Sequence, residues 1–303
     1  MHASSVGCRW SLSYETNVAG RNFPFIAAQK SEHDPEGDSD GSPQFGSERE
    51  MKTPIGNAMQ KGYPASVRNV LRRRDKPGTM TPSNTSVHLR LASYNVHKCV
   101  GTDRKFDPER IGRVIRELSA DILALQEVDQ RFGDKSGLLD LVRLQADTGL
   151  VPIPMPGTRN SHGWRGNLIL VRGGTVENVE QIALPGLEPR GAILADLDFG
   201  QGFFLRVIAA HLGLLRSSRH RQAEVLAGHL LSKDDRISIL MGDLNEWRID
   251  AGSPLAQFLP DEALTAATPR SFPSKLPLLP LDRIIASRPD TLSPILVHNS
   301  SLA

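Results

Sequence analysis

Few cysteines and no long apolar run are present in this sequence of 303 residues. Its two cysteines, Cys8 and Cys99, cannot form the disulfide framework on which small secreted domains depend. A reducing, cytoplasmic environment is therefore expected. No stretch approaches the roughly 18 consecutive apolar residues of a membrane span, and the first residues lack the basic start and apolar core of a signal peptide. We expect an unprocessed, soluble chain without a transmembrane segment.

The chain also carries little net charge. Its 36 basic and 34 acidic residues leave a formal charge of +2. Residues 1–86 hold 11 basic and 9 acidic groups, whereas residues 87–303 hold 25 of each. A protein that coats nucleic acid without sequence preference usually presents a broad basic field. The near-neutral composition argues against that role, although local clusters of arginine leave nucleic-acid binding open.

Two parts of the chain differ in amino-acid composition. Residues 31–50 contain seven acidic residues among many Ser, Gly and Pro, with almost nothing apolar to bury. Such composition cannot offset the entropy of folding. We therefore predict that residues 1–86 form a disordered N-terminal extension and that residues 87–303 form the folded domain.

Within residues 87–303, apolar patterns predict many strands and few helices. Asp107 and Pro108 mark the start of one helix, and Gly149 marks the end of another. The predicted helices span residues 108–118, 138–147 and 218–231. The predicted strands span residues 87–95, 122–125, 167–171, 192–197, 203–210, 237–241, 281–286 and 292–298. This order favours an α+β fold of two stacked sheets covered by helices over a doubly wound parallel sheet.

Polar side chains follow or open several of these strands. They are Asn95, Glu127, His211, Asp243, Asn245 and Asp282. Each has a purely structural explanation when taken alone, such as a turn, a surface ion pair or a hydrogen-bonded core histidine. Together, at the ends of apolar strands, they predict an active site.

The residue types indicate a reaction. A few carboxylates with amide groups suit Mg²⁺, which retains water and binds substrate phosphate oxygens; Mn²⁺ is an alternative. An aspartate and a histidine can deprotonate or orient water. The sequence contains neither a Gly-x-x-x-x-Gly-Lys phosphate loop nor a Gly-x-Ser-x-Gly motif. Hydrolysis of a phosphate ester is the reaction that fits best.

Six short motifs occur in an order that resembles the endonuclease/exonuclease/phosphatase (DNase I-like) family. They are Ser93-Tyr94-Asn95-Val96-His97, Leu125-Gln126-Glu127-Val128, Gly166-Asn167-Leu168-Ile169-Leu170, Ala210-His211-Leu212, Gly242-Asp243-Leu244-Asn245 and Leu281-Asp282-Arg283-Ile284. The resemblance implies a four-layer α/β/β/α sandwich of two mainly antiparallel sheets. It also implies a metal-dependent phosphodiesterase, nuclease or phosphatase that acts as a monomer on a phosphodiester or phosphomonoester.

The resemblance assigns roles to individual residues. Glu127, with Asn95 beside it, is similar to the metal ligand, and His211 to the imidazole that contacts the phosphate or assists the leaving group. Asp243 and Asn245 resemble the pair that handles the attacking water, and Asp282 resembles the carboxylate that orients a final histidine. Asn167 and Arg216 are the candidate substrate-binding residues. We interpret Arg216, Arg219 and Arg221 as the start of a solvated helix that could also contact an anionic substrate.

One element of the family pattern is absent. The family's closing Ser-Asp-His motif has no match before the sequence ends at Ala303. We therefore expect a domain truncated at its C-terminus, lacking its last strand and exposing the edges of neighbouring strands. Impaired hydrolysis is expected as well. Two alternatives remain: an inactive family member that binds phosphorylated ligands or proteins, and a non-enzymatic module with accidental matches.

Overall fold

The computed structural model describes the main part of the chain with defined gaps. The described residues are 9–16, 26–27, 87–158, 160–200, 202–231, 236–248, 250, 252–257, 270–274, 276–288, 291–293 and 295–302. In this part of the chain, no helix combines the length and the hydropathy required to cross a bilayer.

The first sheet has the strand order β12-β1-β3-β4-β6-β5. Its strands are β1 (Arg9–Thr16), β3 (Val87–Asn95), β4 (Ile122–Gln126), β5 (Val151–Pro152), β6 (Leu168–Val171) and β12 (Leu296–His298). Strands β3 and β4 run parallel, and the other neighbours in this sheet are antiparallel. Because β3 and β4 are parallel, Asn95 and Gln126 end them side by side.

The second sheet has the strand order β11-β10-β9-β8-β7-β2. Its strands are β2 (Ile26–Ala27), β7 (Thr175–Leu184), β8 (Arg190–Asp198), β9 (Phe204–His211), β10 (Ile237–Asp243) and β11 (Asp282–Ala286). Strands β9 and β10 are parallel, as are β2 and β7, while the remaining pairs are antiparallel. Both sheets are therefore mainly antiparallel; the parallel pair of the first sheet is central, and the second sheet has two parallel pairs, β9 with β10 and β2 with β7.

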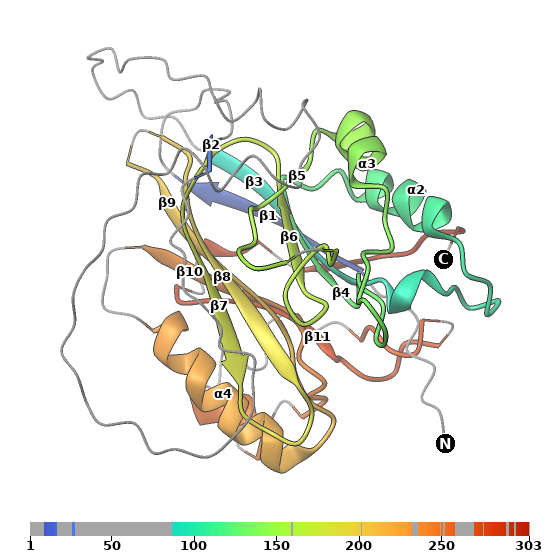
Figure 1. The fold of residues 1–303 in the computed structure, drawn as a ribbon. Helices are drawn as coiled ribbons and strands as arrows, with labels where there is room; N and C mark the ends of the chain where they lie inside the picture. Colours follow the sequence, from blue (N-terminus) through green and yellow to red (C-terminus); the bar gives the residue numbers. More distant parts are fainter. Residues whose placement is uncertain are drawn as a thin grey trace, which may run out of the picture.

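Helices cover the outer faces of the sheets (Figure 1). Helices α2 (Pro108–Leu118) and α3 (Leu141–Thr148) lie together on one side, and α4 (Arg216–Leu230) lies on the other. Asp107 caps α2 by accepting a hydrogen bond from the backbone N–H of Arg110, and Gly149 ends α3 in the left-handed conformation. Two short 3₁₀ helices, His97–Cys99 and Pro254–Gln257, follow β3 and β10. This is the predicted four-layer α/β/β/α sandwich.

Three apolar clusters hold the layers together. The central cluster joins the facing sides of the two sheets and includes Ile169 of β6 and Val207 of β9. The second packs the outer side of the first sheet on α2, and the third packs the outer side of the second sheet on α4. Alternate strand residues therefore face different cores, as the two-residue repeat of a strand requires.

Most predicted elements are present, and β7 is the clear omission. Its buried residues include Val176, Val179 and Ile182, a spacing of three that does not read as strand alternation. The pairing of β7 with β8 shifts register between Val176 and Asn178, and this irregularity breaks the two-residue repeat. The strand predicted at residues 292–298 is shorter and spans only Leu296–His298.

The predicted extension, residues 1–86, falls mainly outside the described residues. Where it is described, Arg9–Thr16 forms β1 and Ile26–Ala27 forms β2. Strand β1 lies between β3 and β12 and pairs with both. A strand edge offers unpaired N–H and C=O groups, which explains why a segment of polar and apolar residues pairs there.

Candidate active site

Three candidate catalytic residues lie side by side on the second sheet. Asp243 ends β10, and its register partners are His211, at the end of β9, and Asp282, at the start of β11. The His211 Nε2 atom is 3.7 Å from Asp243 Oδ2. All three side chains are at least nine-tenths buried. The sheet therefore places two carboxylates and an imidazole in one row without any loop having to bring them together.

Asn95 connects this row to the first sheet. Its side-chain Nδ2 donates to Asp243 Oδ2 over 3.0 Å, although 148 residues separate the two in sequence. Its Oδ1 accepts a hydrogen bond from the backbone N–H of His97 at 3.0 Å. The amide is thus fixed from both sides, and the same edge of both sheets contributes to one site.

Asn245 is held beside Asp243 by two hydrogen bonds. Its backbone N–H donates to Asp243 Oδ1 at 3.1 Å, and its Nδ2 donates to the Leu212 carbonyl at 2.8 Å. Its φ of 50° lies in the left-handed region, which asparagine tolerates better than most residues. The turn after β10 therefore directs Asn245 back to the ends of β9 and β10.

Glu127 follows β4 at the same end of the first sheet. Its carboxylate forms an ion pair with the Lys98 ammonium, and His97 Nδ1 lies 3.8 Å from the same oxygen. Burial would raise the pKa of Glu127, but the charges of His211, Lys98 and His97 and the Lys98 hydrogen bond together lower it to about 2. Glu127 is therefore ionised at neutral pH.

His211 is buried in the centre of the site. Burial lowers its pKa below the ordinary value, and the nearby Arg190 and Lys98 act in the same direction, while Asp243 and Glu127 oppose them. The net direction makes the imidazole neutral at neutral pH. A neutral imidazole can donate one hydrogen bond and accept another.

Asp282 opens β11 next to a buried ionic network. Its backbone N–H donates to Ser271 Oγ at 3.3 Å. The adjacent Arg283 donates to the Glu246 carbonyl at 2.9 Å, and Glu246 in turn accepts from Arg219 Nε at 3.1 Å. Arg219 is 2% exposed, so the interpretation of this residue as part of a solvated helix start is wrong. Its guanidinium donates instead to Glu246 and to the carbonyls of Gly213 and Leu214, in the loops after β10 and β9.

The two candidate substrate-binding residues lie in different environments. Asn167 is fully buried, and its Nδ2 donates to the carbonyls of Trp164 and Gly191, so it ties the loop before β6 to β8. Arg216 is exposed at the start of α4 and donates to the Gly252 carbonyl at 2.8 Å. Arg216 is therefore open to solvent, whereas Asn167 is a buried link between the loop before β6 and β8.

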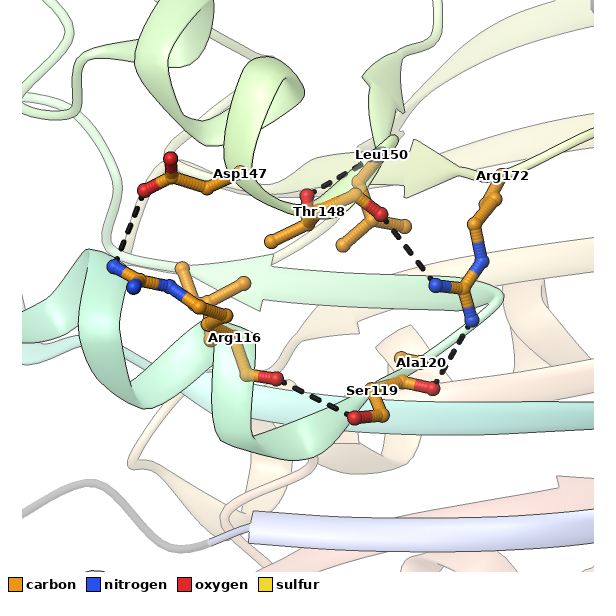
Figure 2. Close-up of a pocket in the computed structure, with 8 residues that line it drawn as sticks. Arg116, Ser119, Ala120, Asp147, Thr148, Leu150 and Arg172 are labelled. Atoms are coloured by element: carbon orange, nitrogen blue, oxygen red, sulfur yellow. Dashed lines mark hydrogen bonds and ion pairs between the residues drawn. The ribbon is translucent and has the colours of Figure 1, made fainter.

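A different part of the molecule contains a cavity of about 160 Å³. It lies between α2, α3 and the end of β6, beside the start of β4 (Figure 2). Its two arginines are already paired, Arg116 with Asp147 at 3.1 Å and Arg172 with Asp121 at 2.7 Å. This cavity is at the opposite end of β4 from Glu127 and is separate from the candidate active site.

The model of the endonuclease/exonuclease/phosphatase family matches residues 92–303. Uncharacterized protein YbhP of Escherichia coli K12 is 30% identical over 228 residues, which cover 68% of this chain and 87% of that protein. The chain belongs to this family. Members of the endonuclease/exonuclease/phosphatase family are phosphoesterases that generally depend on a divalent metal.

Two solved structures resemble this family member at low sequence identity. An endonuclease/exonuclease/phosphatase from Beutenbergia cavernae is 22% identical with a TM-score of 0.48, and the match covers 65% of this chain but only 64% of that one. A humanized TDP2 from D. rerio is 20% identical with a TM-score of 0.48, covering 65% and 82% of the two chains.

The donor groups of this family member fit a hard divalent cation. Glu127 supplies an ionised, largely buried carboxylate, and Asn95 supplies an amide oxygen at the adjacent strand end. The described residues contain no group of three or more His, Cys, Asp and Glu able to hold a metal by themselves. A cation with few protein ligands, many waters and substrate oxygens is the mode typical of Mg²⁺.

The sequence analysis missed three residues at this site: His97, Lys98 and Arg190. Lys98 pairs with Glu127, and Arg190 acts on His211 from the start of β8. His97 and Lys98 follow the candidate metal ligand Asn95 by two and three residues, and this proximity in sequence could have identified them as site residues. Arg190 left no such signal, because its approach to His211 depends on the pairing of β8 with β9.

Proposed function

We propose that this chain hydrolyses phosphate esters in a reaction that requires Mg²⁺. One observation carries the proposal: His211, Asp243 and Asp282 stand in register on three neighbouring strands, and Asn95 reaches Asp243 from the other sheet. Buried polar groups are costly unless they are paired or functional. Their gathering at one sheet edge has a catalytic explanation and no packing purpose.

Asp243 is the residue that orients and deprotonates the attacking water. Each of its carboxylate oxygens already accepts one hydrogen bond, from Asn95 and from Asn245, and each retains a second lone pair. Water oxygen forms a bond to phosphorus, its proton passes to Asp243, and the ester P–O bond breaks. The departing alkoxide takes a proton from solvent.

His211 stabilises the phosphoryl group during this step. The imidazole is neutral at neutral pH and therefore has an N–H to donate to a phosphoryl oxygen. Asp282 fixes the polar row from β11, and Asn245 keeps the turn beside Asp243 in place. Arg216, at the rim, binds the remaining negative charge of the substrate.

Glu127 and Asn95 would hold Mg²⁺ in this proposal. The bound ion would supply charge neutralisation for the phosphate oxygens. Lys98 already provides a positive charge to Glu127, so this carboxylate is arranged to face a cation. The proposal therefore predicts that Lys98 and the metal compete for Glu127.

The test is hydrolysis of bis-p-nitrophenyl phosphate and p-nitrophenyl phosphate by the full chain, with and without Mg²⁺. We expect Mg²⁺-dependent release of p-nitrophenol that is lost in Glu127→Gln. The matched control is Asp121→Asn, because Asp121 precedes β4 whereas Glu127 follows it. Equal activity of wild type and Glu127→Gln would contradict the assignment.

A second readout separates this function from that of an inactive binding protein. Mg²⁺ binding is measured by titration calorimetry in the wild type and in Glu127→Gln. Metal binding that depends on Glu127, without hydrolysis of either ester, would support the binding protein instead. Absence of both metal binding and hydrolysis in the wild type would contradict the assignment of a metal site.

A further inference from the structure

Exposed apolar side chains occur on the loops of the second sheet next to the candidate active site. We call this set the apolar rim and define it as Leu187, Leu214, Leu215, Trp247, Leu276 and Leu278. Leu187 is 82% exposed, Leu214 and Leu276 are each 63% exposed, and the other three are about half exposed. Single exposed leucines are ordinary on a protein surface, whereas a group on one face indicates an interaction site.

Hydrogen bonds join two loops of the apolar rim at Leu214. Its backbone N–H donates to Glu188 Oε1 at 2.8 Å, which places the loop that carries Leu187 beside it. Its carbonyl accepts from the buried Arg219 guanidinium. The same guanidinium lies 5.4 Å from the centre of the Trp247 ring. Leu187, Leu214 and Trp247 are therefore on adjacent loops.

Arg283 joins the last loop to this group. Its guanidinium donates to the carbonyl of Glu246, the residue before Trp247, and to the carbonyl of Pro280. Pro280 lies two residues after Leu278. The buried Arg219 and Arg283 thus connect three loops of the apolar rim, and the hydrogen bond between Leu214 and Glu188 adds the fourth.

The apolar rim borders the mouth of the site because its loops carry the catalytic residues. Leu214 follows His211 after three residues, Trp247 follows Asn245 after two, and Leu278 precedes Asp282 by four. These loops therefore lie beside His211 and Asp282 on the second sheet. The rim therefore lies where only a long group attached to the phosphate would extend beyond the site.

The charges on the described parts of these loops are mainly positive. The exposed charged residues there are Arg216, Arg248, Arg270 and Asp250. Glu188 is only partly exposed and is neutralised by Arg190 at 2.9 Å. Leucines beside arginines match a surface that is apolar below and anionic above, as at the headgroup region of a phospholipid layer.

We propose that the apolar rim docks on an anionic phospholipid surface and that the substrate is the phosphoester headgroup of an amphiphile in that surface. This inference rests on the proposed function. Five of the six residues of the rim are leucine, which inserts among acyl chains but has no ring to stack on a nucleobase. Single-stranded nucleic-acid sites rely on such stacking. The composition therefore favours lipid over nucleic acid.

The test is co-sedimentation of the full chain with vesicles of phosphatidylcholine, with or without phosphatidylglycerol. We expect binding to the anionic vesicles that weakens with salt. The triple variant Leu187→Ser, Leu214→Ser, Leu278→Ser is expected to bind more weakly than the wild type by a factor of at least roughly ten. The matched control is Leu231→Ser, because Leu231 is 51% exposed but follows the far end of α4, about 22 Å from the rim.

Several outcomes would overturn the proposal. The first is no binding of wild type to either kind of vesicle, and the second is equal binding by wild type and the triple variant. A third is tight binding of a labelled single-stranded oligonucleotide that the triple variant loses, without binding to vesicles. A fourth is self-association on a sizing column that the triple variant abolishes, because the rim would then be an interface between copies.

Hydrolysis assays separate this inference from the proposed function. The triple variant should hydrolyse bis-p-nitrophenyl phosphate at the wild-type rate, since that ester is soluble and small. Vesicle binding needs no turnover, so it can be measured even if the wild type hydrolyses nothing. Failure of hydrolysis with intact, rim-dependent vesicle binding would refute the proposed function and the substrate assignment but not the docking surface. Hydrolysis without vesicle binding would refute the docking surface alone.

Discussion

The two ends of strand β4 each carry a carboxylate beside a basic side chain, and they differ in their surroundings. Asp121, before β4, pairs with Arg172 at 2.7 Å, and the Arg172 side chain is 44% exposed. Glu127, after β4, pairs with Lys98, whose side chain is 37% exposed, and it has His97 and His211 as further neighbours. The first pair is a closed surface ion pair, whereas the second belongs to a larger cluster of titratable groups.

The backbone shows the same difference. At the Glu127 end, His97, Lys98, Glu127 and Asn245 all have positive φ angles between 47° and 58°. Such conformations are uncommon for residues other than glycine and concentrate at functional sites. At the Asp121 end, the one such residue beside the cavity is Ser119, which serves as the C-cap of α2. Conformational cost is concentrated where side chains must converge.

The largest effect that separates the two ends should come from Asp243→Asn. We expect kcat/KM for bis-p-nitrophenyl phosphate to fall roughly a thousandfold or more, because Asp243 is bonded to Asn95 and Asn245 and adjoins His211. Asp121→Asn should change the rate less than about twofold, since that residue touches none of these groups. Steady-state kinetics with Mg²⁺ measures both. Comparable losses in the two variants would show that the ends do not differ in function.

The next largest effect concerns folding stability at the site end. Arg219→Met leaves Glu246 buried without its ion-pair partner, and both side chains are at most 2% exposed. We expect the free energy of unfolding to fall by about 3–5 kcal/mol. The matched change at the other end is Arg172→Met, for which about 0–1 kcal/mol is expected. Urea denaturation compares them, and equal destabilisation would contradict this ranking.

A smaller effect should appear in the pH dependence of stability at the site end. Burial raises the pKa of Asp129 from its ordinary 3.8 to about 6, against backbone hydrogen bonds from His162 and Gly163 that lower it. The folded state therefore holds this proton more tightly, so its stabilising contribution is complete below pH 3.8 and is lost as pH rises through 6. At neutral pH the ionised carboxylate destabilises the fold.

The corresponding variant is Asp129→Asn, whose side-chain oxygen can still accept from the backbone N–H of His162. We expect a gain of about 1–3 kcal/mol in unfolding free energy at neutral pH and little change below the ordinary pKa of Asp129. Denaturation at a series of pH values measures this gain. A gain of the same size at every pH would mean that titration of Asp129 is not the cause.

The smallest effect should be that of Asp121→Asn on stability. An exposed ion pair contributes about 0–1 kcal/mol, and salt screens it. We therefore expect a small loss in unfolding free energy at low ionic strength that disappears at high ionic strength. Thermal unfolding at two salt concentrations measures it. A loss in unfolding free energy above about 1 kcal/mol that does not depend on salt would show that this ion pair behaves like a buried one.

Sequence patterns predicted most of the fold because burial repeats along its strands and helices. The helix 108–118 was found from a capping Asp107 and a following proline, both of which act locally. Strand β7 was missed because its bulge breaks the local repeat. The pairing of β1 with β3 and β12 could not be predicted either, since it depends on which strand edges are left open.

Candidate site residues were predictable to the extent that they stand at strand ends. Asn95, His211 and Asp243 follow apolar runs, and the structure brings these three together. Arg219 was misread because charge and position along a helix do not reveal which face is buried. Lys98 was overlooked because its partner, Glu127, is 29 residues away.

The sequence by itself determined which residues are strands, which groups end them, and that carboxylate, amide and imidazole chemistry is available, because these follow from local burial and residue type. Only the tertiary structure decided that Asn95 meets Asp243 across two sheets and that Arg219 and Arg283 tie three loops together beside the site. Such contacts join residues far apart in sequence. Their geometry is set by strand register and sheet packing, which no local pattern encodes.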